Sequence, residues 1–173
     1  MANTYSKLAT YTVGSGGIGS VSFINIPQNY TDLIIKVSVR SMSAGTEDTM
    51  NISFNGLMTN YSLRFITTGG GTPASYNRDV FGYDFLAVIP AAAATANTFG
   101  NIEMYLANYT SINYKPMVVE AVMENNSSTN YNTVQNALWS NTAPITSIKF
   151  VSSVPYNIAQ HSTFHLYGIK AEL

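Results

Sequence analysis

The fold class is decided by the eight residues LIIKVSVR at positions 33–40. Aliphatic side chains stand at every second position, at Leu33, Ile35, Val37 and Val39. Most of the positions between them are polar. Successive side chains of a β-strand point to opposite faces, so this alternation predicts a strand with one buried and one mainly polar face.

The same period of two recurs along the chain on both sides of this stretch. Met50, Ile52 and Phe54 alternate with polar residues and are followed by Asn55-Gly56, a dipeptide typical of tight turns between strands. Further strands are predicted at residues 5–13, 20–26, 61–65, 84–89, 102–106, 117–123, 148–150 and 163–167. The face assignment predicts that Phe54 is buried and that Lys36 and Arg40 lie on the polar face, where their loss costs little stability.

The connections between these strands are rich in glycine, asparagine, proline and serine, which is typical of turns and loops. Helical composition occurs only at Ala91–Ala96, which is too short for an independent helix. We therefore predict a single all-β domain over residues 1–173. The expected fold is an antiparallel β-sandwich of jelly-roll type with about ten strands and almost no helix.

The surface is polar but almost uncharged. Charged residues make up 10% of the 173 residues, against about 25% in an ordinary globular domain, and the net charge is −1. The eight Lys and Arg residues are scattered, which predicts no nucleic-acid partner. Cysteine is absent, which excludes a disulfide framework and a thiolate zinc site. No signal peptide or membrane span is evident, so we expect a soluble protein made in a cytoplasm.

The residues Gly14–Gly19 match the spacing GxGxxG of dinucleotide-binding loops. That reading requires a helix to begin at the glycines and an acidic residue about twenty positions later. The segment that follows, Ser20–Phe23, is typical of a strand, and the acidic residue is missing. A hairpin loop is the better interpretation, and we predict no cofactor.

Glu120 and Glu124 are the first candidates for an acid–base pair. Four residues of a strand span roughly 13 Å, whereas retaining glycosidases need about 5–5.5 Å and inverting ones about 6.5–9.5 Å between carboxylates. The two glutamates therefore fit neither geometry, although a carboxylate from another strand could complete a pair. Solvated carboxylates on a strand face are the favoured interpretation.

The other candidate constellations are also sparse. His161 and His165 are the only histidines, and on a strand they would share one face without a third metal ligand in view. Glu47-Asp48 has no calcium-loop spacing and is interpreted as a polar turn. We therefore assign no catalytic, cofactor-binding or metal-binding residue and expect no enzyme activity.

Tyrosine is abundant and often stands beside asparagine or serine. Many of the 12 tyrosines stand in such contexts, for example Tyr30, Tyr61, Tyr109, Tyr114 and Tyr131. Exposed tyrosines of this kind suit protein or sugar recognition. The alternative is that the rings enter the core at strand ends and only the hydroxyls reach the rim.

Four segments carry a resemblance to a known family. They are residues 26–33 (IPQNYTDL), 95–101 (TANTFGN), 138–142 (LWSNT) and 166–170 (LYGIK). Together they resemble small virion proteins of tailed bacteriophages. The resemblance covers most of the chain and implies a β-sandwich module on the particle exterior, either a capsid decoration (cement) protein or a fibre-like appendage. It implies no particular binding residues.

We accordingly expect a non-enzymatic decoration protein at the virion surface that binds the major capsid protein and associates as a homotrimer. The alternative is a tail or fibre module that recognises host carbohydrate, with a tyrosine or Trp139 stacked on the sugar. A polysaccharide depolymerase is disfavoured because it needs a carboxylate pair that the sequence does not supply.

Overall fold

The computed structural model describes residues 5–69, 72–80, 84–125, 130–152 and 155–170. These residues form twelve strands and no helix. The strands are β1 (Tyr5–Thr12), β2 (Val21–Phe23), β3 (Asp32–Val39), β4 (Glu47–Phe54), β5 (Tyr61–Gly69), β6 (Thr72–Val80), β7 (Asp84–Pro90), β8 (Gly100–Leu106), β9 (Lys115–Met123), β10 (Tyr131–Trp139), β11 (Ile148–Ser152) and β12 (Thr163–Ile169).

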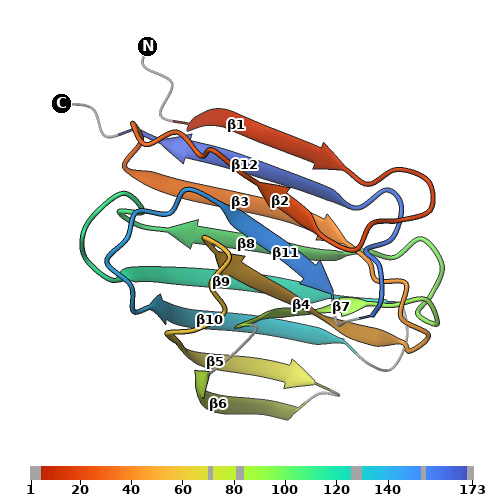
Figure 1. The fold of residues 1–173 in the computed structure, drawn as a ribbon. Helices are drawn as coiled ribbons and strands as arrows, with labels where there is room; N and C mark the ends of the chain where they lie inside the picture. The colour runs from red at the N-terminus through yellow and green to blue at the C-terminus, as the bar shows by residue number, and fades with distance from the viewer. Residues whose placement is uncertain (1–4, 70–71, 81–83, 126–129, 153–154, 171–173) are drawn as a thin grey trace.

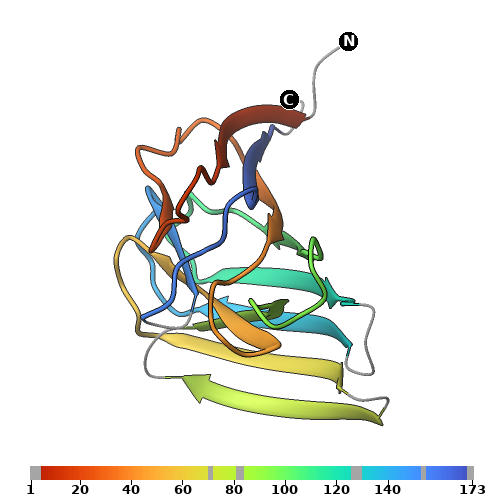
Figure 2. The same cartoon turned by 90° about the vertical axis from the view of Figure 1, so that its right-hand side faces the viewer.

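The strands form two antiparallel sheets packed face to face (Figure 1). The large sheet has eight strands in the order β1-β12-β3-β8-β9-β10-β5-β6, and the small sheet has four in the order β2-β11-β4-β7. The all-β sandwich predicted from the alternation is therefore confirmed. Figure 2 shows the small sheet on one side of the large sheet, with β5 and β6 beyond it.

Eight of the strands pair in a nested pattern. β1 pairs with β12, β2 with β11, β3 with β8, and β4 with β7. The first and third of these pairs join through β12 and β3, and the second and fourth join through β11 and β4. Two hairpins, β5–β6 and β9–β10, are inserted into this frame, and both extend the large sheet past β8.

The core lies between the two sheets. The predicted inward positions of β3 are all buried, and so are Met50, Ile52 and Phe54 of β4. The ring of Phe54 meets the ring of Trp139 edge-on, with centroids 5.5 Å apart. Trp139 is fully buried, so the expectation that it stacks on a sugar is wrong. Because Trp139 lies on the inward face of β10, its ring is part of the core.

Two of the twelve strands, β6 and β10, were missed by the sequence pattern. The inward face of β10 carries Thr133 and Gln135, while Val134 and Leu138 point outward, so its alternation is inverted in polarity. β6 has no apolar residue at every second position and contains Pro73, a residue confined to edge strands and bulges within sheets. Both strands belong to the inserted hairpins.

The turns explain part of the asparagine content. Five asparagines adopt positive φ, namely Asn25, Asn55, Asn60, Asn97 and Asn108. Asparagine tolerates this left-handed conformation better than most non-glycine residues. The Gly14–Gly19 segment connects β1 to β2, and no helix follows it. The predicted hairpin is wrong, because β1 and β2 lie in different sheets and the segment crosses from one sheet to the other. Gly17 has φ of 73° there, and a Cβ would lie 2.6 Å from the carbonyl oxygen of Ile158.

Two cations are built into the fold. The Arg40 guanidinium donates to the carbonyl oxygens of Ala92, Ala94, Thr95 and Thr98, and so fixes the loop between β7 and β8. The prediction that Arg40 is a solvated residue of the polar face is therefore wrong, because the strand ends at Val39 and the side chain turns toward this loop. The buried Lys115 ammonium donates to the carbonyls of Asn113 and Asn141.

Candidate functional site

The face of the large sheet directed away from the small sheet, here named the open face, is the main candidate surface. Strand alternation places the residues between the core positions on it, so its composition follows from the sequence once the core face is known. Two groups of exposed apolar residues stand out on this face. The aliphatic patch consists of Ile66, Val118, Val122 and Val134, and the tyrosine patch consists of Tyr5, Tyr105 and Tyr167.

The aliphatic patch is contiguous across three neighbouring strands. Val134 of β10 lies directly opposite Ile66 of β5 on one side and Glu120 of β9 on the other. Val118 and Val122 flank Glu120 along β9, also on the open face. The four side chains are between 42% and 59% exposed. β-branched residues on both faces of a strand are typical of sheets covered on both sides.

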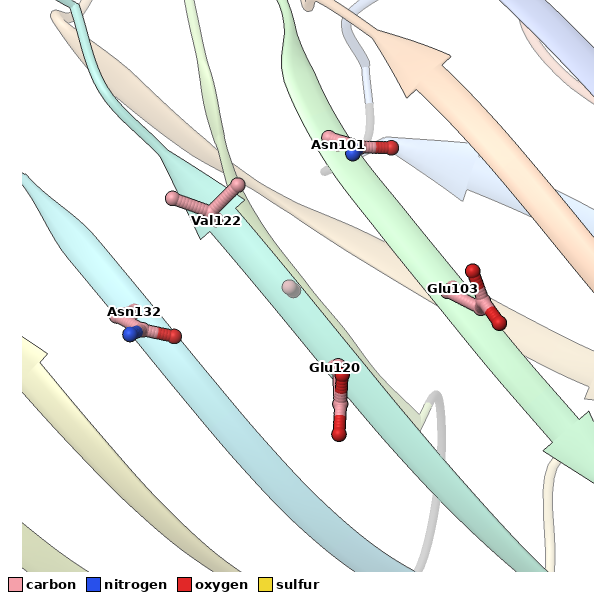
Figure 3. A pocket seen from close by; sticks show the side chains of 6 residues that line it. Asn101, Glu103, Glu120, Val122 and Asn132 are labelled. Atoms are coloured by element: carbon pink, nitrogen blue, oxygen red, sulfur yellow. The ribbon is translucent and has the colours of Figure 1, made fainter.

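A shallow hollow lies next to this patch (Figure 3). Glu103 and Glu120 stand opposite each other on β8 and β9, with Asn101, Val122 and Asn132 completing the rim. Like charges directly opposite destabilise a sheet. The repulsion between the two carboxylates is reduced, because the Lys36 ammonium lies 2.8 Å from the Glu103 carboxylate. Glu103 is thus the carboxylate that a neighbouring strand supplies to Glu120.

Glu124 does not join this hollow, because it lies past the end of β9. Glu120 lies on β9 and Glu124 lies beyond the end of that strand. The Glu103–Glu120 pair is exposed on a flat sheet, and one of its members is held in an ion pair about half exposed to solvent. The two carboxylates are better described as solvated surface groups than as an acid and a base directed at one glycosidic bond.

The two histidines do not share a face. His161 lies in a turn before β12 and has φ of 70°, whereas His165 lies on β12 and its Nδ1 contacts the Thr10 hydroxyl. Among the described residues, no three histidine or acidic side chains gather as metal ligands would.

Glu47 and Asp48 begin β4, so the predicted polar turn is instead the start of a strand. Asp48 accepts hydrogen bonds from the Ser41 hydroxyl and the Thr49 amide, and Glu47 accepts one from the Tyr131 hydroxyl at 3.2 Å. Both carboxylates therefore have structural partners within the chain.

Some of the tyrosines named for their asparagine or serine neighbours place their rings in the core, and others are exposed at the surface. Tyr61 and Tyr109 are buried, and their hydroxyls donate to the carbonyls of Leu57 and Pro27 at the rim. Burial raises the pKa of the Tyr109 hydroxyl. Tyr30 and Tyr131 pack against Gly168 and Gly69, where a Cβ would collide with the rings. Tyr114 is 54% exposed.

The pattern of asparagine and serine neighbours does not find Tyr105 and Tyr167 of the tyrosine patch, because neither stands beside such a residue. The members of the patch lie on β1, β8 and β12. Tyr105 and Tyr167 lie on either side of Ile34 of β3, and Tyr5 lies opposite Ile169. The Tyr105 hydroxyl donates to Asp32 at 2.7 Å, and this bond, with burial, raises the pKa of Tyr105 to about 12. Alternation could have found Tyr105 and Tyr167, because each stands between two buried positions of its strand.

No family model, curated protein or solved structure matches this chain. In the described part of the chain, no helix is long and apolar enough to cross a membrane.

Proposed function

We propose that this protein is a structural protein on the exterior of a bacteriophage particle and that it binds the capsid shell through its open face. The observation that carries the proposal is the aliphatic patch. Four β-branched side chains on one flat face, each about half exposed, favour a surface that another protein covers. The virion-protein resemblance of the sequence supports the same assignment.

The strand pairing supports a jelly roll within the sandwich. In a jelly roll, eight strands pair in nested order: the first with the last, the second with the second last, and so on to the two middle strands. The pairs β1–β12, β2–β11, β3–β8 and β4–β7 follow this order. Jelly rolls are frequent in viral capsid and lectin domains. Since a fold does not fix a function, this point supports the proposal without carrying it.

The chemistry of the open face favours a protein partner of low charge. Around the aliphatic patch the rim is formed mainly by amide and hydroxyl side chains, including Asn101, Asn132 and Asn136. The charged groups partly neutralise one another, as Lys36 and Glu103 do. Apart from Glu120, which stands among the four aliphatic side chains, the surface has an apolar centre and a polar rim, the usual anatomy of a protein interface.

Copy number in purified particles tests this proposal. Quantitative mass spectrometry of virions of the phage that encodes the chain should find it in amounts comparable with the major capsid protein, because a decoration protein covers the whole shell. A few copies per particle, or its absence from the particle, would rule out the decoration role.

The tyrosine patch favours host carbohydrate as a second candidate partner. Half-exposed aromatic rings beside carboxylates such as Asp32 suit stacking and hydrogen bonding to a sugar. Under this alternative the protein is a tail or fibre module. A glycan array compares wild type with Tyr5→Ala: selective binding that the substitution removes would support this candidate, and a blank array would remove it.

A further inference from the structure

The four sheet edges of the sandwich differ in how they are protected against pairing with another chain. β1 carries a bulge at Leu8, and β7 carries one at Leu86, where the register with the neighbouring strand shifts. β2 has only three residues. Bulges and very short strands are devices that keep sheet edges from pairing.

The remaining edge, β6, has no bulge and is not short, and its proline, Pro73, and its charged residues, Arg78 and Asp79, stand toward its two ends. Its nine residues pair with β5 in unbroken register from Thr72 to Val80. Within the described residues no strand pairs with its outer side, where it ends the large sheet. Figures 1 and 2 show that the β5–β6 hairpin projects beyond the small sheet, so that sheet does not cover the edge. A long, flat, uncovered edge is a template for strand addition.

We infer that the outer edge of β6 pairs antiparallel with the β6 edge of a second copy of this chain, about a two-fold axis at Tyr76. Proline in an edge strand turns its missing N–H side outward, so Pro73 places the amides of Ser75 and Asn77 on the outer side. In this register Ser75 of each copy lies opposite Asn77 of the other, and the backbones exchange hydrogen bonds there. No like-charged residues lie opposite each other.

Tyr76 is the reason for choosing a second copy as the occupant. Its ring stacks on Phe65, with centroids 5.0 Å apart and planes at 24°, yet it remains 47% exposed. A two-fold axis at this position brings the two Tyr76 residues directly opposite each other. The stack then continues through four rings, from Phe65 of one copy to Phe65 of the other, and aromatic pairs across strands stabilise a sheet.

This geometry has a consequence for the open face. A two-fold axis between antiparallel strands stands perpendicular to the sheet, so both copies turn their open faces to the same side. The pair thus presents one sixteen-stranded sheet, twice the eight of a single copy, with two aliphatic patches on one surface. The inference is independent of the shell proposal, because it concerns the isolated protein.

Light scattering after size-exclusion chromatography measures the mass of the isolated full chain. We expect twice the chain mass of 18.8 kDa. Ser75→Pro removes an outward amide without removing a bond to β5 and should give one chain mass with an unchanged circular-dichroism spectrum. A wild-type mass of one chain would overturn the inference, and so would three chains, the homotrimer expected from the sequence.

The absence of cysteine allows a direct test of the register. Residues directly opposite in a hydrogen-bonded pair have Cα atoms about 5.5 Å apart, within the range of a disulfide. A mixture of the Ser75→Cys and Asn77→Cys variants, both of which keep Tyr76, should therefore form a covalent dimer rapidly under mild oxidation. Each variant alone is the matched control, because Ser75 lies opposite Asn77 of the other copy and not opposite itself. Equal rates for the mixture and the single variants would overturn the two-fold axis at Tyr76.

Discussion

Arg40 shows how much one residue can add to the stability of a loop. Its guanidinium donates to four backbone carbonyls of the loop between β7 and β8, and its pKa is lowered by burial. Arg40→Ala leaves those carbonyls without their donor, and we expect a loss of roughly 1–3 kcal/mol in unfolding free energy. Lys36→Ala removes only an exposed ion pair and should cost no more than about 0.5 kcal/mol. Urea titration compares the two, and equal midpoints would contradict this role of Arg40.

The hydroxyl of Tyr105 makes stability depend on alkaline pH. Its pKa in the folded protein is raised to about 12, above the ordinary value of 10.0, because it donates to Asp32. The folded state therefore keeps a proton that the unfolded chain loses, and stability falls as pH rises from about 10 to about 12. Tyr105→Phe should make this fall shallower in urea titrations at pH 9, 10 and 11. An unchanged slope would show that the Tyr105–Asp32 bond does not hold the proton.

At the scale of elements, β4 is one of the strands whose buried and outward faces the sequence predicted correctly. Phe54 is fully buried, with its ring against Trp139 and Tyr61. Phe54→Ala should cost about 3–5 kcal/mol. Thr49→Ala, a partly buried position nearer the start of the same strand, is the control and should cost much less. If the Thr49 variant unfolds at the lower urea concentration, the inward face of β4 is assigned wrongly.

The elements also show where sequence reasoning stops. Strands that bury an apolar face, such as β3 and β8, could be predicted because burial imposes the alternation. The inserted strands β6 and β10 could not, because β6 is an uncovered edge and β10 buries Thr133 and Gln135. The Glu103–Glu120 pair was equally hidden, since it depends on which strands are neighbours and in what register. Val118 and Val122, apolar on the outward face of β9, were the one available sign of the aliphatic patch.

At the scale of the whole molecule, the two hairpins β5–β6 and β9–β10 account for the surface to which we assign function. The nested eight-strand frame closes a core, and the hairpins widen only one of its sheets. The hairpins supply all four side chains of the aliphatic patch. Three come from β9 and β10, and the fourth, Ile66, comes from β5. The aliphatic patch is therefore an addition to the frame, because all of its side chains come from the hairpins.

The central claim is that this open face binds the shell, and co-sedimentation with empty capsids of the encoding phage tests it most directly. Ile66→Lys places a charge in the aliphatic patch, where Ile66 is 59% exposed. Ile112→Lys is the matched control, since Ile112 is 79% exposed and lies in the loop after β8, outside the open face. We expect the Ile66 variant to fold normally and to bind at least about tenfold more weakly, which corresponds to roughly 1.4 kcal/mol, while the Ile112 variant binds like wild type. Equal binding by the two variants, or loss only in the Ile112 variant, would contradict the claim.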